Sequence, residues 1–160
     1  KGVTMAVEIE RKFLVKTMPS KEISISKKIK QGYIINEKHN IVRVRRKDDD
    51  HFVTIKGNTI GITRLEFEYP IPRKDAEDMF DNLCGHNIIE KTRHYVHNAG
   101  HTWEIDEFHG NNQGLIVAEI ELESEKEKFE VPDWVGDEVT QDLRYYNMNL
   151  TTHPFLDWKK

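Results

Sequence analysis

The sequence has very little cysteine and no long apolar run. Cys84 is the only cysteine among 160 residues, which excludes an internal disulfide and a cysteine-based metal site. No apolar run approaches the roughly 20 residues that a membrane-spanning helix needs. No signal-peptide pattern precedes Met5. We therefore expect a cytoplasmic protein without a membrane partner, in which Lys1–Thr4 are a native extension or a cloning remnant.

The sequence also lacks an excess of positive charge. Its 24 Lys and Arg and 28 Asp and Glu give a net charge of −4, which argues against bulk attraction to nucleic acid but does not exclude a local basic pocket. Only 37% of the residues are hydrophobic and 32% are charged, yet aromatic and aliphatic residues are too frequent for a disordered chain. This length fits one domain, and we expect a single domain over residues 1–160.

Short segments of alternating polarity dominate the chain. The predicted strands lie near residues 6–15, 28–36, 41–47, 51–57, 64–71, 88–97, 101–109 and 115–123. Residues 47–51 predict a tight polar hairpin loop, and Pro72 followed by a helical apolar stripe predicts a helix that ends near Cys84. We interpret Cys84 as a small core residue. Residues 136–150 are expected to contain a short helix, and the charge run 123–130 is expected to be a solvated loop.

Charged residues recur at every second position in VEIERKFLV, residues 7–15. In a strand, Glu8, Glu10 and Lys12 share one face, and apolar residues such as Ile9 occupy the other. The same alternation repeats along the chain. The pairs at i and i+2 are Glu8 and Glu10, Arg43 and Arg45, Thr54 and Lys56, Glu66 and Glu68, Lys91 and Arg93, Glu104 and Asp106, and Glu119 and Glu121.

Two folds explain this alternation. One is an antiparallel sheet with a solvated face, and the other is a closed eight-stranded barrel with a charged interior. Segregation of the charges by sign favours the barrel, because a solvated face usually mixes signs along each strand. We therefore predict an α+β, mainly antiparallel β protein: an eight-stranded closed β-barrel with a charged lumen and a few outer helices.

The charged face predicts a site for a divalent cation together with a polyanion. Neighbouring carboxylates repel one another unless a cation lies between them, and neighbouring Arg and Lys side chains need an anion. Magnesium prefers oxygen ligands, which Glu8, Glu10, Glu119 and Glu121 would supply, with Asp106 as a fifth carboxylate. Arginine forks and lysine ammonium groups bind phosphate oxygens. The sequence has no defensible zinc spacing among its eight histidines and no glycine-rich phosphate loop.

An ordered set of short motifs runs from Val7 to about Phe155: EIERKFL, QGYI, VRVR, TIKG, EFEY, EKTRH, WEIDEF and AEIEL. This set resembles the CYTH superfamily, the triphosphate tunnel metalloenzymes. The resemblance implies an eight-stranded antiparallel tunnel that holds a triphosphate and one or two Mg²⁺ or Mn²⁺ ions. With GHTWEIDEFHG and DWVGDEVT, the short chain looks most like the bacterial inorganic triphosphatase branch of the family.

The resemblance also implies roles for individual residues. The implied metal ligands are Glu8, Glu10, Glu119 and Glu121, with Asp106 nearby. The implied phosphate-binding residues are Lys12, Arg43, Arg45, Lys56 and Arg93. Lys91 and Tyr33 resemble a catalytic pair that orients or activates water. Glu66, Glu68 and Glu104 either join the site or only pair with its cations, whereas Arg11 and Arg46 have the opposite parity and are expected at the surface.

Three functions agree with these patterns. The first is a metal-dependent hydrolase that releases orthophosphate from inorganic triphosphate, or from a longer or organic triphosphate. The second is a class IV adenylate cyclase, which needs a base-recognition pocket that no stretch clearly supplies. The third is a non-catalytic polyphosphate-binding module, which a broken carboxylate set would favour, although the set here is complete. In each case the partner is a small phosphate chain, nucleic acid is not required, and a homodimer is left open.

Overall fold

The computed structural model of the chain describes residues 6–37 and 39–158, so the prediction for residues 1–4 lies outside the described residues. Its strands are β1 (Val7–Val15), β2 (Ile23–Asn36), β3 (Ile41–Lys47), β4 (Asp50–Ile60), β5 (Thr63–Pro70), β6 (Ile88–Asn98), β7 (His101–Phe108), β8 (Ile116–Glu121) and β9 (Val135–Glu138). Its helices are α1 (Arg73–Leu83) and α2 (Asn147–Leu150). Single 3₁₀ turns lie at Gly110–Asn112, Leu143–Tyr145 and Phe155–Asp157.

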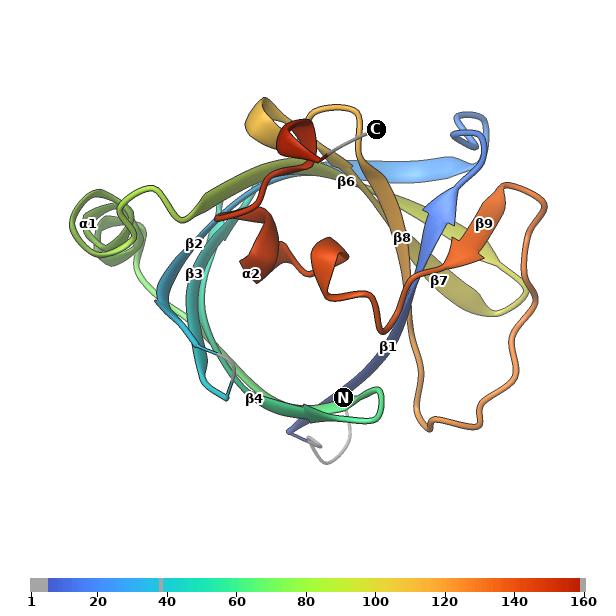
Figure 1. The fold of residues 1–160 in the computed structure, drawn as a ribbon, viewed down its shortest axis with the longest axis horizontal. Coiled ribbons are helices and arrows are strands. Elements are labelled where there is room, and N and C mark those ends of the chain that lie inside the picture. The colour runs from blue at the N-terminus through green and yellow to red at the C-terminus, as the bar shows by residue number, and fades with distance from the viewer. Residues whose placement is uncertain (1–5, 38, 159–160) are drawn as a thin grey trace.

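The strands form a closed antiparallel barrel (Figure 1). Their order is β5-β4-β3-β2-β6-β7-β8-β1-β9, and an additional β5–β1 pairing closes the ring. β1 makes the closure by pairing Val7–Ile9 with β5 and residues 10–14 with β8. β9 pairs with the end of β1, at Phe13 and Val15. The predicted eight-stranded antiparallel barrel is therefore confirmed, with one extra strand.

The outer face of β1, β7 and β8 is apolar and is covered by the segment that leads to β9. Trp103, Ile105 and Ile120 are fully buried in this layer. The Trp103 ring packs edge-to-face against Phe129 and Trp134, with centroids 5.8 and 5.4 Å away. The charge run at residues 123–130 is an irregular loop as predicted, but Phe129 anchors it to the barrel.

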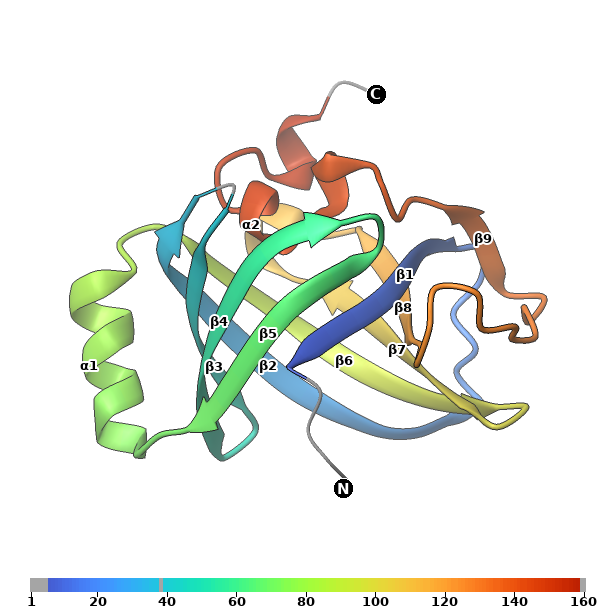
Figure 2. The ribbon, with the colours of Figure 1, turned by 90° about the horizontal axis from the view of Figure 1, so that it is seen from below.

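Helix α1 covers the outer face of β2 and β3 on another side of the barrel (Figure 2). Its buried residues Ala76 and Phe80 pack in one cluster with Val44 of β3 and Cys84. Cys84 is buried, as predicted for a core residue. A Cβ added at Gly32 would lie only 2.6 Å from the Cys84 Sγ atom, so this position of β2 requires glycine.

Two strand boundaries differ from the predicted ones by more than two residues, and one strand was not predicted. β2 begins at Ile23 rather than near residue 28, and β4 continues through Gly57 to Ile60. A register shift between Lys56 and Thr59 accommodates the glycine within the strand. β9 was not predicted, because its four residues, VGDE, carry no apolar alternation. The predicted short helix within 136–150 is present as α2.

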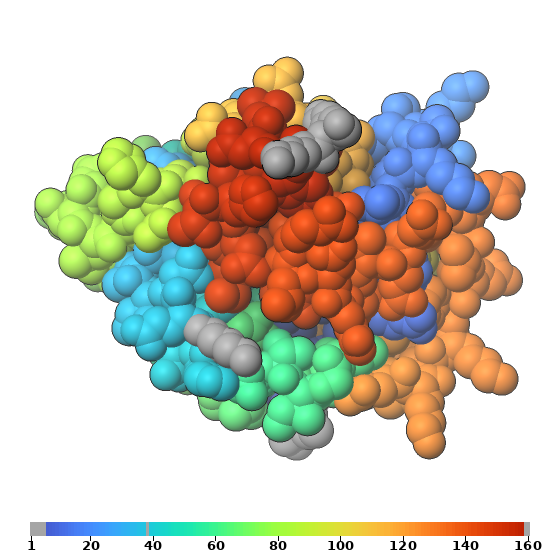
Figure 3. Space-filling view, viewed as in Figure 1, coloured from blue at the N-terminus to red at the C-terminus, as the bar shows by residue number. Residues whose placement is uncertain are grey.

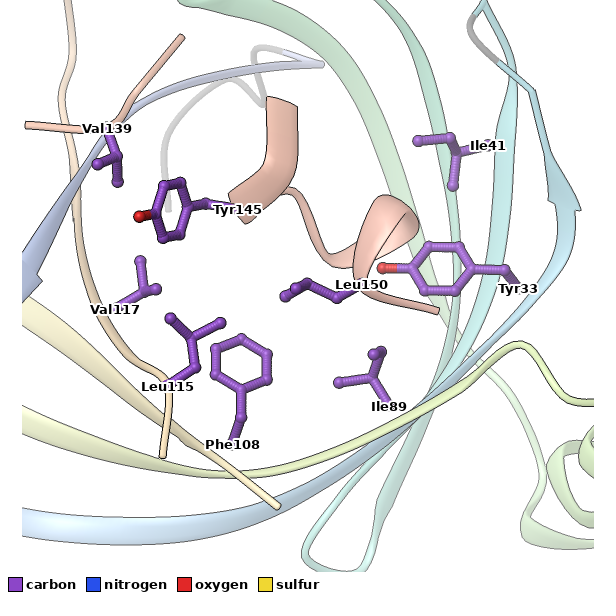
Figure 4. Packing of buried hydrophobic residues seen from close by; sticks show 9 residues of the cluster. All are labelled: Tyr33, Ile41, Ile89, Phe108, Leu115, Val117, Val139, Tyr145 and Leu150. Atoms are coloured by element: carbon purple, nitrogen blue, oxygen red, sulfur yellow. The ribbon is translucent and has the colours of Figure 1, made fainter. Parts of the chain in front are cut away.

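The C-terminal segment, residues 140–158, lies across one mouth of the barrel (Figures 1 and 2). Its atoms fill the centre of that face in the space-filling view (Figure 3). Tyr145 and Leu150 of this segment pack on apolar residues from the inner barrel wall (Figure 4). The other buried residues of this layer are Tyr33, Ile41, Ile89, Phe108, Leu115, Val117 and Val139. Among the described residues, no helix is long and apolar enough to cross a membrane.

Candidate active site

The charged parity of the strands lines a cavity of about 320 Å³ inside the barrel. The lining residues for which the sequence predicted a role are Glu8, Glu10, Lys12, Tyr33, Arg43, Arg45, Lys56, Lys91, Arg93, Glu119 and Glu121. Glu66, Glu68 and Glu104 line it too. Asp106 is the one predicted site residue that is not part of the lining.

Strands β1 and β8 place two pairs of glutamates side by side. In their register, Glu10 is opposite Glu121 and Lys12 is opposite Glu119. The Lys12 Nζ atom donates to Glu10 at 2.8 Å and to Glu119 at 3.1 Å. Burial, together with the charges of Glu119 and Glu8, raises the pKa of Glu10 to about 7. The carboxylates are thus crowded enough to repel one another.

A second lysine lies between carboxylates of β1 and β5. The Lys56 Nζ atom donates to both Glu8 oxygens at 3.1 and 3.2 Å and lies 3.3 Å from Glu66. Burial raises the pKa of Glu8, although the Lys56 charge opposes the shift. Among the described residues, no three His, Cys, Asp or Glu side chains already surround a metal position. The four glutamates of β1 and β8 nevertheless fit a divalent cation, because they place several carboxylate oxygens, the ligands that such ions prefer, close together.

Arg43 and Arg45 of β3 line one side of the cavity, which we call the β3 wall. Arg43 donates from Nη2 to Thr54 at 3.3 Å and lies 3.9 Å from Glu68, and its Nε atom has no hydrogen-bond partner among the described residues. Arg45 donates from Nε and Nη2 to the neutral Gln31 Oε1 atom, at 3.1 and 3.0 Å. Burial and the charges of Arg43 and Arg93 lower the pKa of Arg45 to about 10. This wall therefore has more positive charge than its protein partners neutralise.

Lys91 of β6 and Arg93 of β6 line what we call the β6–β7 wall of the cavity. Asp106 of β7, which does not line the cavity, is their counter-ion. Asp106 is opposite Arg93 in the strand register. It accepts hydrogen bonds from Arg93 Nε and Nη2 at 2.7 and 2.9 Å and from Lys91 Nζ at 2.7 Å. Glu104 accepts a further bond from Arg93 at 3.0 Å. Asp106 is fully buried, and both of its carboxylate oxygens accept hydrogen bonds from the two cations. This geometry supports a role for Asp106 as their counter-ion. Its role near the metal stays a prediction.

Burial of Lys91 has a clear electrostatic consequence. Its side chain is 1% exposed. Burial, with the nearby charges of Arg93 and Arg45, lowers the pKa of Lys91 to about 7, although Asp106 opposes the shift. Tyr33, the other predicted catalytic residue, is buried, and its hydroxyl oxygen accepts a hydrogen bond from Gln31 Nε2 at 3.0 Å.

The structure adds residues that the sequence analysis missed. Lys47 and Arg64 line the cavity and share the parity of the predicted charges on their strands, so a longer alternation pattern would have found them. Gln31 lies two residues before Tyr33 on the inner face of β2 and is fully buried. The C-terminal segment contributes Tyr146, whose ring centroid is 5.5 Å from Lys12 Nζ, and Asn147. No local pattern marked these two residues.

The outer-face arginines lie where their parity predicted. Arg11 of β1 forms an ion pair with Glu138 of β9, and both side chains are about one-third exposed. Arg46 of β3 is exposed. Neither residue lines the cavity.

The CYTH domain family model matches residues 6–154 of the chain. The chain belongs to the CYTH domain family. This CYTH-domain protein is 45% identical over 156 residues to an inorganic triphosphatase of Acetivibrio thermocellus, covering 98% of this chain and 100% of the relative. It is 36% identical over 147 residues to an inorganic triphosphatase of Nitrosomonas europaea, covering 89% and 95%.

A solved structure shares the same fold over nearly the whole chain. The crystal structure of the inorganic triphosphatase NE1496 superposes on this CYTH-domain protein with a TM-score of 0.67 and 32% identity. The match covers 93% of this chain and 97% of that one. The predicted family and the predicted barrel are confirmed together.

Proposed function

We propose that this CYTH-domain protein is a divalent-metal-dependent hydrolase that cleaves inorganic triphosphate and releases orthophosphate. The observation that carries the proposal is the composition of one buried cavity, with carboxylates on β1 and β8 and cations on β3 and β6. A linear triphosphate spreads its negative charge along a chain and can contact cations on several strands at once. The names of the full-length relatives support the same activity.

The basic residues grip the phosphate chain in this proposal. The β3 wall supplies planar arginine forks whose charge the protein neutralises only in part, so Arg43 and Arg45 bind phosphate oxygens most directly. Binding of the non-reacting phosphates aligns the reacting one. The further phosphate-binding residues are Lys12, Lys56 and Arg93. Lys12 and Lys56, which contact Glu10, Glu119 and Glu8 in the structure, would be available to phosphate oxygens if those carboxylates bound a metal.

The metal ligands in this proposal are Glu8, Glu10, Glu119 and Glu121, which would hold one or two Mg²⁺ or Mn²⁺ ions. When bound there, such an ion would supply neutralisation of the phosphate charge and activation of the attacking water. The raised pKa of Glu10 supports this assignment, because a cation relieves the repulsion among these carboxylates. Lys91 and Tyr33 orient the attacking water in this proposal.

A substrate series tests the function. The protein is incubated with tripolyphosphate, pyrophosphate, ATP and a phosphate monoester, each with Mg²⁺, Mn²⁺ or EDTA, and orthophosphate, pyrophosphate and cyclic AMP are assayed. We expect tripolyphosphate to be hydrolysed about a hundredfold faster than pyrophosphate or the monoester, because shorter substrates lose the aligning contacts. EDTA should abolish turnover. Equal rates for pyrophosphate, formation of cyclic AMP, or binding without turnover would each contradict the proposal.

Replacement of metal ligands tests the role of the glutamates. Glu10→Ala and Glu121→Ala should lower kcat by about a hundredfold or more at saturating Mg²⁺, because the ion loses a ligand. The fold should remain intact in Glu10→Ala, since the change relieves carboxylate repulsion. Glu138→Ala is the matched control, because Glu138 lies outside the cavity beside Arg11. Near-normal activity of both inner variants would remove these residues from the metal site.

A further inference from the structure

The C-terminal segment brings one amide side chain to the predicted catalytic lysine. Asn147, the first residue of α2, lines the cavity. Its Oδ1 atom accepts a hydrogen bond from Lys91 Nζ at 2.8 Å, while Asp106 Oδ2 accepts another from the same ammonium at 2.7 Å. The two acceptors reach Lys91 from elements far apart in sequence, β7 and α2.

Two fixed acceptors determine where the lysine ammonium points. A lysine ammonium has three N–H donors and no acceptor. Asn147 and Asp106 take two of these donors, and Lys91 lines the cavity, so the third N–H is left for an atom inside the cavity. Rotation about the Cε–Nζ bond would break a short hydrogen bond to one acceptor or the other. The direction of the third N–H is thus set by the protein before the substrate arrives.

Asn147 also connects Lys91 to the other predicted catalytic residue. Its Oδ1 atom accepts a second hydrogen bond, from Gln31 Nε2 at 3.0 Å, and Gln31 Nε2 also donates to the Tyr33 hydroxyl. The Gln31 Oε1 atom accepts both bonds from Arg45, which fixes the orientation of the Gln31 amide. One amide oxygen of the C-terminal segment thus joins Lys91 to the Gln31–Tyr33 pair.

From this geometry we infer that Asn147 is a positioning residue for hydrolysis, which acts through Lys91. It holds the ammonium so that the third N–H meets the phosphoryl oxygen or the attacking water. The inference rests on the proposed function. It also gives the segment across the barrel mouth a part in the chemistry, because the segment carries the acceptor.

Other contacts hold the segment in place, so the role of Asn147 can be separated from anchoring. Leu150 is buried in the apolar layer under the segment. Asn36 of β2 donates from Nδ2 to the Met148 carbonyl oxygen at 3.0 Å and to Thr151 at 3.3 Å. No hydrogen bond joins Asn36 to Lys91 among the contacts of the described residues.

Three variants test the inference. Asn147→Leu has a similar shape and no acceptor, Asn147→Asp keeps the acceptor, and Asn36→Ala removes a different anchor of the same segment. For each we would measure kcat and KM for tripolyphosphate, the Tm, and the Kd of tripolyphosphate for the metal-free protein by calorimetry. The binding and unfolding measurements separate positioning from folding, since a positioning residue changes kcat and leaves them nearly unchanged.

The expected pattern has one large change. Asn147→Leu should lower kcat about tenfold, with KM, Kd and Tm close to wild type, because the Lys91 ammonium loses its fixed orientation but keeps its charge. Asn147→Asp should keep kcat within about threefold while KM rises, since its carboxylate repels the anionic substrate. Asn36→Ala should keep kcat within about twofold of wild type, because the Lys91 contacts remain.

Several results would overturn the inference. They are an unchanged kcat in Asn147→Leu, an equal loss in Asn147→Leu and Asn147→Asp, or a loss in Asn36→Ala as large as that in Asn147→Leu. If Asn147→Leu does not fold, Asn147→Ala is judged by the same criteria. Wild-type turnover is measured first: without it the proposed function fails, and with it an unchanged Asn147 variant overturns only the positioning role.

Discussion

Buried cations line two walls of the cavity: Arg43 and Arg45 on the β3 wall, and Lys91 and Arg93 on the β6–β7 wall. On the β6–β7 wall, Asp106 accepts three hydrogen bonds from the two cations, all between 2.7 and 2.9 Å. On the β3 wall, Arg45 donates to a neutral amide, and the Arg43 Nε atom has no partner within residues 6–37 and 39–158.

The two walls differ in whether the protein itself compensates their buried positive charge. A buried charge is costly unless a partner compensates it. The fold supplies that partner to the β6–β7 wall, where Asp106 and Glu104 compensate the charges of Lys91 and Arg93 before any ligand binds. On the β3 wall the nearest printed contact with a carboxylate is the long one from Arg43 to Glu68, at 3.9 Å, and Arg45 donates to a neutral amide. Burial and the charges of Arg43 and Arg93 lower the pKa of Arg45. An anionic substrate is the natural counter-ion of the β3 wall.

The largest expected effect comes from removing the counter-ion of the β6–β7 wall. Asp106→Ala leaves Lys91 and Arg93 buried without a carboxylate between them. We expect the free energy of unfolding to fall by about 3–5 kcal/mol, as for other broken buried ion pairs. Urea denaturation followed by circular dichroism measures this change.

The matched variant lies on the other wall. Arg43→Met should change the free energy of unfolding by less than about 1 kcal/mol, because the Arg43–Glu68 contact is long, at 3.9 Å, and the Glu68 side chain is about one-third exposed. If both variants lose the same stability, the two walls do not differ in the way their hydrogen bonds indicate. A stable Asp106→Ala protein would also break the comparison.

The sequence predicted the barrel because each inner strand repeats one simple signal. The alternation of Glu8 and Glu10 with apolar neighbours follows directly from the pleat of a strand, and so does that of Arg43 and Arg45. Their convergence on one cavity could be predicted because a closed barrel leaves one interior for the inward parity. The segregation of these pairs by sign predicted a metal and a polyanion, because neighbouring like charges repel unless an ion of the opposite sign lies between them.

The remaining features depend on contacts that no local pattern encodes. Asp106 has the parity of a cavity residue, and its hydrogen bonds to Arg93 and Lys91 depend on the register of β6 and β7, which the sequence does not specify locally. Asn147 reaches Lys91 only because the C-terminal segment folds back over the barrel mouth. β9 is specified by pairing with β1 and not by its own composition. Tertiary context decides each of these placements.

A smaller effect is expected from a change of geometry at constant charge on the β3 wall. Arg43→Lys keeps the positive charge and loses the planar fork that binds two phosphate oxygens. We expect kcat/KM for tripolyphosphate to fall at least about tenfold, or about 1.4 kcal/mol of transition-state stabilisation. Steady-state kinetics measure the loss, and thermal unfolding should be unchanged.

Arg46→Lys is the control for this change, because Arg46 lies on the same strand and is exposed on the outer face. Its kcat/KM should stay within about twofold of wild type. Wild-type kinetics in Arg43→Lys, or an equal loss in Arg46→Lys, would show that fork geometry on the β3 wall does not contribute to substrate binding.

The smallest expected effect concerns the hydroxyl that steadies Arg43. Thr54 Oγ1 accepts a hydrogen bond from Arg43 Nη2 at 3.3 Å and donates to Glu68 Oε1 at 2.9 Å. Thr54→Val removes the hydroxyl with little change of shape. We expect kcat/KM to fall about two- to fivefold, mostly through KM, because the hydrogen bond from the Arg43 guanidinium is long, at 3.3 Å, and the Arg43 charge and fork are retained.

A double-mutant cycle identifies the partner through which Thr54 acts. If the hydroxyl acts by orienting the Arg43 fork, Thr54→Val should have almost no further effect in an Arg43→Lys background, because the fork is already absent. Kinetics of the two single variants and the double variant complete the cycle. Additive losses would mean that Thr54 affects the cavity by another route, for example through Glu68. The Arg43 fork, whose Nε atom has no partner among the described residues, would then not need the Thr54 hydroxyl to bind substrate.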